Sequence, residues 1–72
     1  MAEFKYEIIT TFGDLSGEKS WKKELNLIKW NDREAKYDLR EWSPGRAKMG
    51  KGITLSKDEL IALRALLQSM DL

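Results

Sequence analysis

The residues best suited to binding chemistry lie between positions 36 and 55, where cations, aromatic rings and glycines occur close together. Lys36, Arg40 and Trp42 are spaced by two residues or multiples of two, so on a β-strand their side chains point to one face. No acidic residue occurs from Ser43 to Leu55, and three glycines there leave backbone N–H groups accessible. The same loop carries the further cations Arg46, Lys48 and Lys51. Cations contact phosphates and flat rings stack on bases, so this segment predicts binding of a single-stranded nucleic acid.

The three tryptophans of the chain and the carboxylate of Asp38 need separate interpretation. A tryptophan is more often a core residue than a stacking platform. Trp42, however, shares its strand face with Lys36 and Arg40, and we therefore predict that it lies on the side of the sheet that is not packed into the core. For Trp21 and Trp30, core packing and base stacking both remain open. Asp38 would repel phosphate from this same face, and we expect it to orient Arg40 or a lysine through a salt bridge.

One motif in the basic loop does not indicate the activity that it resembles. Residues 45–51 fit the phosphate-binding pattern G-x-x-x-x-G-K, but Gly52 follows where magnesium binding requires Ser or Thr. The segment Ile53–Leu55 also reads as a strand, whereas a phosphate-binding loop leads directly into a helix. We therefore exclude a nucleotide hydrolase.

Composition makes an enzyme the weakest class for this chain. The sequence contains no histidine and no cysteine, which removes the commonest acid–base catalyst and the common metal ligands. No carboxylate pair is placed to act as acid and base. We expect no catalytic residue, no metal, no cofactor and no small-molecule substrate.

The length of 72 residues predicts one domain, residues 1–72, with a core of marginal size. Because disulfides are excluded, stability is expected to come from a second copy, so a homodimer is predicted. The net charge is only +1, but residues 1–18 carry −3, residues 19–55 carry +5 and residues 56–72 carry −1. A basic face can therefore exist on a nearly neutral chain.

No segment is long and apolar enough for a membrane span or a signal peptide. We expect no membrane association and a cytoplasmic location, with association with the nucleoid as one option.

The hydrophobic pattern predicts an α+β fold, in which a four-stranded antiparallel twisted sheet precedes one C-terminal helix. The expected strands are residues 3–12, 19–30, 35–42 and 52–55, and the helix covers residues 57–70. In the first strand the shared parity of Phe4, Tyr6, Ile8 and Phe12 predicts that all four face the core. In the second strand apolar residues change face near Leu27-Ile28, which indicates either a bulge or partial cover on both faces.

The C-terminal segment has a clear helix start and an unusually wide apolar side. Ser56 and Glu59 form a capping-box pattern. Apolar residues then recur at helical spacing over more than one stripe, which predicts that the helix packs on its sheet and also against a second helix. The alternative is a broad contact within one chain. The predicted dimer interface consists of Leu60, Ile61, Leu63, Leu66, Leu67 and Met70.

Two segments together resemble a known family. Asp38-Leu39-Arg40-Glu41-Trp42, a basic loop, then Gly50–Leu55 and a capped helix are similar to the transcriptional coactivator family of positive cofactor four, in particular its compact bacterial YdbC-like branch. The resemblance extends from Trp21 onward. It implies a β-β-β-β-α protomer that dimerises largely through the helix and binds single-stranded DNA on its open sheet face. The eukaryotic relatives carry a regulatory tail without counterpart here, so the resemblance implies the DNA-binding core rather than coactivation.

Residue by residue, the resemblance assigns contacts on that face. Arg40 matches the arginine of the third strand, Trp42 stands at or next to a stacking aromatic, and Lys51 matches the cation before the last strand. Lys22 or its neighbour Lys23 matches a lysine of the second strand, and Trp30 lies beside another stacking position. With the cations of the basic segment, the predicted nucleic-acid-binding set is Lys22, Lys23, Asn26, Trp30, Lys36, Arg40, Trp42, Arg46, Lys48 and Lys51.

The leading hypothesis is thus single-stranded DNA binding with little sequence preference, in transactions such as transcription regulation, replication or repair. Binding of RNA through the same face is a second hypothesis. A third is a protein-interaction module whose open sheet docks a partner on its tryptophans.

Overall fold

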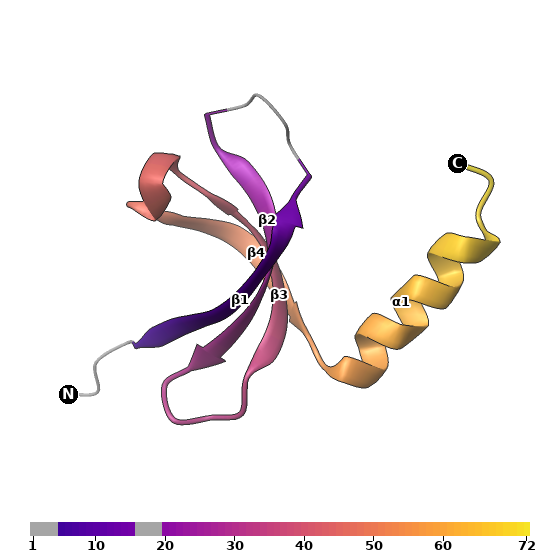
Figure 1. Cartoon of the computed structure of the whole chain (residues 1–72), viewed down its shortest axis with the longest axis horizontal. Helices are drawn as coiled ribbons and strands as arrows, with labels where there is room; N and C mark the ends of the chain where they lie inside the picture. Colours follow the sequence, from indigo (N-terminus) through magenta and orange to yellow (C-terminus); the bar gives the residue numbers. More distant parts are fainter. Residues whose placement is uncertain (1–4, 16–19) are drawn as a thin grey trace.

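The computed structural model, which describes residues 5–15 and 20–72, contains one four-stranded antiparallel sheet followed by one helix (Figure 1). The strands pair in chain order, β1-β2-β3-β4. This architecture confirms the predicted α+β fold. The elements are β1 (Tyr6–Asp14), β2 (Lys22–Trp30), β3 (Lys36–Trp42), the 3-10 turn η1 (Pro44–Arg46), β4 (Met49–Leu55) and α1 (Lys57–Ser69).

The observed strand limits differ from the predicted ones mainly at β1 and β4. β4 begins at Met49 rather than at residue 52, so part of the predicted basic loop is strand. β1 continues to Asp14 rather than ending at residue 12. Residues 3, 4 and 19 of the predicted strands, and with them the prediction for Phe4, lie outside the described residues.

The sheet has two chemically different faces, which we name after two neighbouring residues of β3. The pairing of β2 with β3 places alternate residues on the same side. The Arg40 face carries Lys22, Glu24, Asn26, Ile28, Trp30, Lys36, Asp38, Arg40 and Trp42. The Leu39 face carries Leu25, Leu27, Tyr37 and Leu39 from the same strands and Ile53 and Leu55 from β4.

The sheet is curled toward its Arg40 face. The Tyr6 ring centroid lies 5.8 Å from that of Trp30 and 5.7 Å from that of Trp42. Trp30 and Trp42 stand at opposite ends of the β2–β3 pair, which in a flat sheet would be about 26 Å apart. Only a strongly curled sheet lets one ring touch both, so the Arg40 face is concave and holds the most deeply buried side chains.

β1 contains two irregularities that change which residues face the concave side. The pairing register shifts between Ile8 and Thr10 and again between Thr11 and Gly13. The first shift lies opposite Leu27-Ile28, where a bulge was one of two alternatives for β2, but the extra residue belongs to β1. The prediction that Phe12 shares the face of Tyr6 is therefore wrong, because its ring packs 5.9 Å from that of Tyr37 on the Leu39 face.

Helix α1 begins at the predicted capping box and extends beside the sheet (Figure 1). Ser56 Oγ accepts a hydrogen bond from the Glu59 N–H at 3.1 Å, and Glu59 Oε1 accepts one from the Ser56 N–H at 2.8 Å. The helix contacts β3 and β4, yet none of its residues is buried. In the part of the chain that the structure describes, no helix combines the length and the apolar character that a membrane crossing requires.

At Gly52, which pairs with Arg40, β3 leaves no room for a side chain on β4. A Cβ atom at this position would lie 2.5 Å from the Leu39 carbonyl oxygen and 2.6 Å from the Arg40 Cα. Both are backbone atoms, which cannot move aside without breaking the pairing. Gly52 is thus required by space rather than by backbone conformation.

Candidate nucleic-acid interface

A cationic hollow of about 380 Å³ lies where the β2–β3 turn meets β4. Its lining contains three cations, one acid, one indole and one hydroxyl group. These residues are Trp30, Arg33, Glu34, Lys36, Arg40 and Thr54. An excess of cations beside a large ring is the combination that holds a phosphate next to a base.

Arg40 is the best-positioned cation of this hollow. Its Nε donates to Asp38 Oδ1 at 2.7 Å, its Nη1 to the Gly50 carbonyl at 3.4 Å, and its guanidinium carbon lies 4.9 Å from the centre of the Trp30 ring. Its side chain is 14% exposed, whereas that of Asp38 is 0% exposed. The predicted salt bridge is therefore present, and it holds a flat cation against a flat ring with one edge open to solvent.

The floor of the concave face beneath Arg40 is polar. Asn26 and Asp38 stand directly opposite each other on β2 and β3, and both are fully buried. Asn26 Oδ1 and Asp38 Oδ2 have no hydrogen-bond partner among the described residues, nor does the Nε1 of buried Trp42. Two acceptors thus face each other across the strand pair, and Arg40 is the cation that offsets the charge of this floor.

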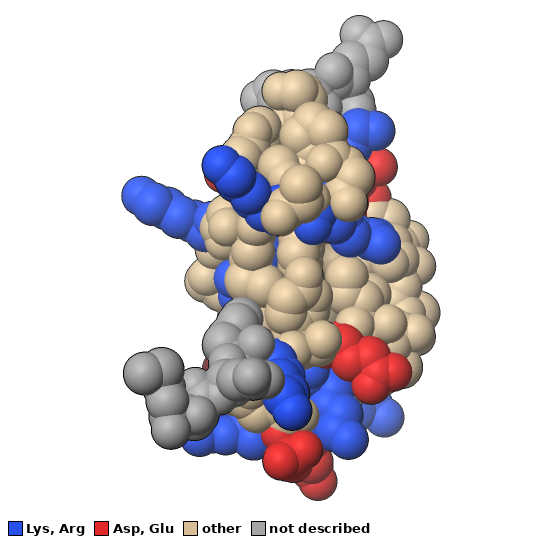
Figure 2. Space-filling view, turned by 90° about the vertical axis from the view of Figure 1, so that its left-hand side faces the viewer, with Lys and Arg blue, Asp and Glu red and all other residues tan. Residues whose placement is uncertain are grey.

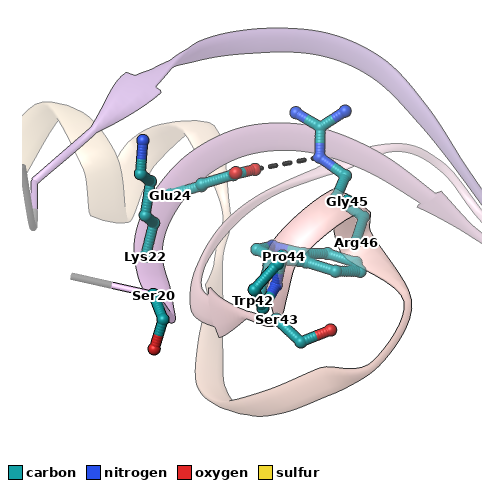
Figure 3. A pocket seen from close by; sticks show the side chains of 8 residues that line it. All are labelled: Ser20, Lys22, Glu24, Trp42, Ser43, Pro44, Gly45 and Arg46. Carbon is teal, nitrogen blue, oxygen red and sulfur yellow. Dashed lines mark hydrogen bonds and ion pairs between the residues drawn. The ribbon is translucent and has the colours of Figure 1, made fainter. Parts of the chain in front are cut away.

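A second hollow, of about 560 Å³, lies at the other end of the β2–β3 pair, against η1 (Figure 3). Lys22 and Glu24 of β2 stand across from Trp42 and the turn. Arg46 Nε lies 3.1 Å from Glu24 Oε1, and Arg46 Nη2 donates to Thr11 Oγ1 at 2.9 Å. Arg46 therefore joins the turn to both β2 and β1. The complete lining is Ser20, Lys22, Glu24, Trp42, Ser43, Pro44, Gly45 and Arg46.

Local backbone conformation explains why Arg46 reaches back over the sheet. Gly45 and Arg46 adopt left-handed conformations, with φ of 67° and 57°. The turn is closed by hydrogen bonds from the Arg46 N–H to the Ser43 carbonyl (2.9 Å) and from the Lys48 N–H to Ser43 Oγ (2.7 Å). The chain reverses within three residues, so the Arg46 side chain returns toward β2.

The predicted nucleic-acid-binding residues fall into two groups in space. Lys22, Trp30, Lys36 and Arg40 lie on the Arg40 face, and Arg46 reaches its edge. Lys48 is exposed just after η1. Figure 2 shows that Lys and Arg side chains spread over the side of the molecule turned away from α1.

Lys23 and Lys51 lie on the opposite face from Arg40. Together with Leu39, Glu41 and Ile53 they line a shallow hollow on the Leu39 face. The alternation of β2 leaves Lys22, not Lys23, on the side of Arg40. Lys51 belongs to β4, which begins at Met49, and it is two residues before Ile53. Ile53 pairs with Leu39, so the alternation of the strand places Lys51 on the Leu39 face as well.

Two predicted contact residues are buried. The expectation of an exposed Trp42 is wrong, because this side chain is only 1% exposed, although it does share the face of Arg40. The curled sheet brings the Tyr6 ring against it, an arrangement that depends on contacts distant in sequence. Asn26 is also fully buried and donates to Glu24 Oε1 at 3.2 Å. Asn26 therefore offers no surface to a ligand, and Trp42 offers only the small exposed part of its ring that lines the hollow beside η1.

The linings of the two hollows include residues outside the predicted set, and the charged residues Arg33 and Glu24 are among them. Arg33 belongs to the turn after Trp30 and was not among the predicted contacts. The sequence did contain a signal for Arg33, because a cation three residues after a tryptophan, in a tight turn, lies close to the indole ring. Glu24 had no such signal, since its position depends on the return of Arg46 from a distant turn.

Exposed apolar side chains occur on helix α1 and on the neighbouring Leu39 face. A groove of about 380 Å³ is lined by Leu25 of β2 and by Leu60, Ile61, Leu63, Arg64, Leu67 and Gln68 of α1. Beyond it Leu66 and Met70 are 62% and 53% exposed, and Ile53 is 56% exposed. Exposed apolar side chains gathered on one element are typical of interaction surfaces.

The structure thus combines one sheet and one helix, with cations on the concave face of the sheet and exposed apolar side chains on the helix. The sequence model of the family Transcriptional Coactivator p15 (PC4) matches residues 17–66, and the chain belongs to this family, which is a family of non-enzymatic nucleic-acid-binding proteins. An uncharacterized protein of Treponema pallidum (strain Nichols) is 51% identical over 71 residues, which cover 97% of this chain and 84% of the relative.

Proposed function

We propose that this chain forms a homodimer that binds single-stranded DNA on its Arg40 face with little sequence preference. The cellular role would be a DNA transaction such as transcription regulation, replication or repair. The observation that carries the proposal is the cationic hollow at Trp30, in which Arg33, Lys36 and Arg40 face one acid, Glu34. Family membership supports a nucleic acid as the ligand.

The chemistry of the hollow suits an unpaired strand. The Arg40 guanidinium carbon lies 4.9 Å from the centre of the Trp30 ring, so a phosphate bound by Arg40 would place its base beside the indole, on which it can stack. In a duplex the bases are already stacked on each other and cannot reach this surface. Duplex DNA is therefore expected to bind much more weakly.

The homodimer rests on the apolar surface of α1. None of the helix residues is buried within the chain. Even the apolar side chains of Leu66 and Leu67 are 62% and 45% exposed. A helix of 13 residues is marginal in water without tertiary packing. A second copy that covers the groove between α1 and the Leu39 face would supply that packing and leave both Arg40 faces open.

The direct test is titration of the protein with oligo-dT of about twenty nucleotides at several salt concentrations, followed by tryptophan fluorescence. We expect quenching whose midpoint moves to higher DNA concentration as salt rises. Lys36→Ala should lower the slope of log affinity against log salt by about 0.7, the value for one phosphate contact on a single strand.

Lys29→Ala is the matched control for this substitution. Lys29 is an exposed lysine on the neighbouring strand β2, but its parity places it on the opposite face from Lys36. It should leave the slope unchanged. Equal effects of the two substitutions would mean that only net charge matters, and equal competition by duplex DNA would refute the stacking mechanism. Stronger binding of oligo-rU than of oligo-dU would favour RNA as the ligand.

A further inference from the structure

The hollow beside η1 differs from the cationic hollow at Trp30, because its wall contains a carboxylate whose hydrogen bonds involve a single oxygen. Asn26 Nδ2 and Arg46 Nε both donate to Glu24 Oε1, at 3.2 and 3.1 Å. Among the described residues none donates to Oε2, and the Glu24 side chain is 15% exposed. A carboxylate of limited exposure therefore presents one acceptor oxygen to whatever enters this hollow.

The remaining groups of the wall are hydrogen-bond donors and an apolar side. Lys22 stands next to Glu24 on the same strand face, and Ser43 lies across from it (Figure 3). The Ser43 hydroxyl accepts from the Lys48 N–H within the turn and is directed away from Glu24, so Lys22 is the donor beside the carboxylate (Figure 3). Pro44, together with the small exposed part of the Trp42 ring, forms the apolar part of the wall.

A carboxylate is a poor contact for a DNA backbone, because it repels phosphate, but it is a specific contact for a base. Carboxylates accept hydrogen bonds from the exocyclic amino group of cytosine. Uracil and thymine carry a carbonyl oxygen at that ring position, which repels a carboxylate. The volume of about 560 Å³ is within the range of ~300–1,000 Å³ for sites of small organic groups.

We propose that the hollow beside η1 binds one base of the single strand and selects cytosine over uracil or thymine through Glu24 Oε2. Lys22, next to Glu24 on the same strand face, donates to an acceptor atom of the same base. This selection rests on the proposed function and applies to one nucleotide of an otherwise base-tolerant path. Hydrogen bonds from Asn26 Nδ2 and from Arg46 Nε hold the Glu24 carboxylate at the wall of the hollow, so the carboxylate keeps one of its two donors when Arg46 is replaced.

The test compares oligo-dC with oligo-dU of equal length at mildly alkaline pH. The two bases differ only at two neighbouring ring positions: cytosine has an amino group on C4 and no proton on N3, whereas uracil has a carbonyl oxygen on C4 and a proton on N3. We expect oligo-dC to bind about fivefold more tightly, the factor for ~1 kcal/mol at the lower end of base readout. Glu24→Gln should bring this ratio close to one, even if the loss of a negative charge strengthens binding of both oligonucleotides.

Two further variants separate base selection from other effects. Glu41→Gln removes the same charge from an exposed position on the Leu39 face and should keep the ratio. Arg46→Ala breaks the ion pair but keeps the carboxylate, and it should weaken both oligonucleotides while preference for oligo-dC persists.

The outcomes distinguish this inference from the proposed function. If the native protein binds both oligonucleotides equally, or if Glu24→Gln keeps the preference, base selection by Glu24 is refuted while single-stranded DNA binding stands. If neither oligonucleotide binds at low salt, the proposed function fails and the selection fails with it.

Discussion

Replacement of Arg40 is predicted to affect stability as well as binding, and a second substitution separates the two effects. Arg40 is the cation bonded to Asp38, whose carboxylate is fully buried. Loss of one partner from a buried ion pair costs about 3–5 kcal/mol, because the other charge stays buried without compensation. A domain of this length has about 4–11 kcal/mol of total stability, at 0.05–0.15 kcal/mol per residue.

Arg40→Met keeps most of the side-chain length against Trp30 and removes the charge, so it should lose about half of the free energy of unfolding. Asp38→Asn added to it removes the buried charge. The side-chain amide introduced by this second substitution would also face Asn26 Oδ1, an acceptor without a partner among the described residues. The double variant should therefore recover most of the stability that the single variant loses.

Urea unfolding at one fixed protomer concentration measures both variants, since the stability of the proposed dimer would depend on concentration. With a slope of about 1 kcal/mol per molar urea for a small domain, the single variant should shift the midpoint by about 3 M or more. The double variant should fold but bind oligo-dT with a salt slope lower by about 0.7, because the phosphate contact is absent. If the double variant is no more stable than the single one, Arg40 stabilises through its contact with Trp30, and the charge argument is refuted.

Three further predictions concern the fold and the assembly. Gly52→Ala should destabilise the domain by more than about 3 kcal/mol in urea unfolding, because two backbone atoms occupy the place of the new Cβ. Gly45→Ala, at a left-handed turn position with open space, should cost only about 1–2 kcal/mol. Equal costs of the two substitutions would contradict the spatial argument. Leu67→Glu should convert the dimer to monomers in sedimentation experiments, while Ala62→Glu, an exposed helix position outside the apolar groove, should not, and a native monomer at micromolar concentration would refute the dimer. Ser56→Ala should cost about 1 kcal/mol through loss of the helix cap, measured by thermal unfolding, and no loss would mean that the helix start is held by other contacts.

Alternation along the strands predicted much of this structure correctly. The shared face of Lys36, Arg40 and Trp42 follows from a period of two, and the helix start follows from a local hydrogen-bond pattern. The salt bridge between Asp38 and Arg40 was also predictable, because residues two apart on a strand are neighbours on one face.

What alternation could not predict is how far each face is covered. Trp42 is buried because the sheet curls and Tyr6, 36 positions earlier in the chain, lies against it. Phe12 changes face because β1 contains extra residues that no local pattern marks. The position of Lys51 depends on where β4 begins, and the glycines on either side of that lysine made the start of the strand read as a loop.

The close approach at Gly52 also has a consequence for how this fold tolerates change in length. Arg40 can pair only with a residue that lacks a side chain, so the alignment of β3 and β4 is determined at this crossing and not by the turn that joins them. The connecting residues 43–48 can therefore gain or lose residues without shifting either strand. Insertions in this turn would reshape the hollow at one end of the concave face while the cationic hollow at the other end keeps its geometry, so the two ends of this face can diverge independently.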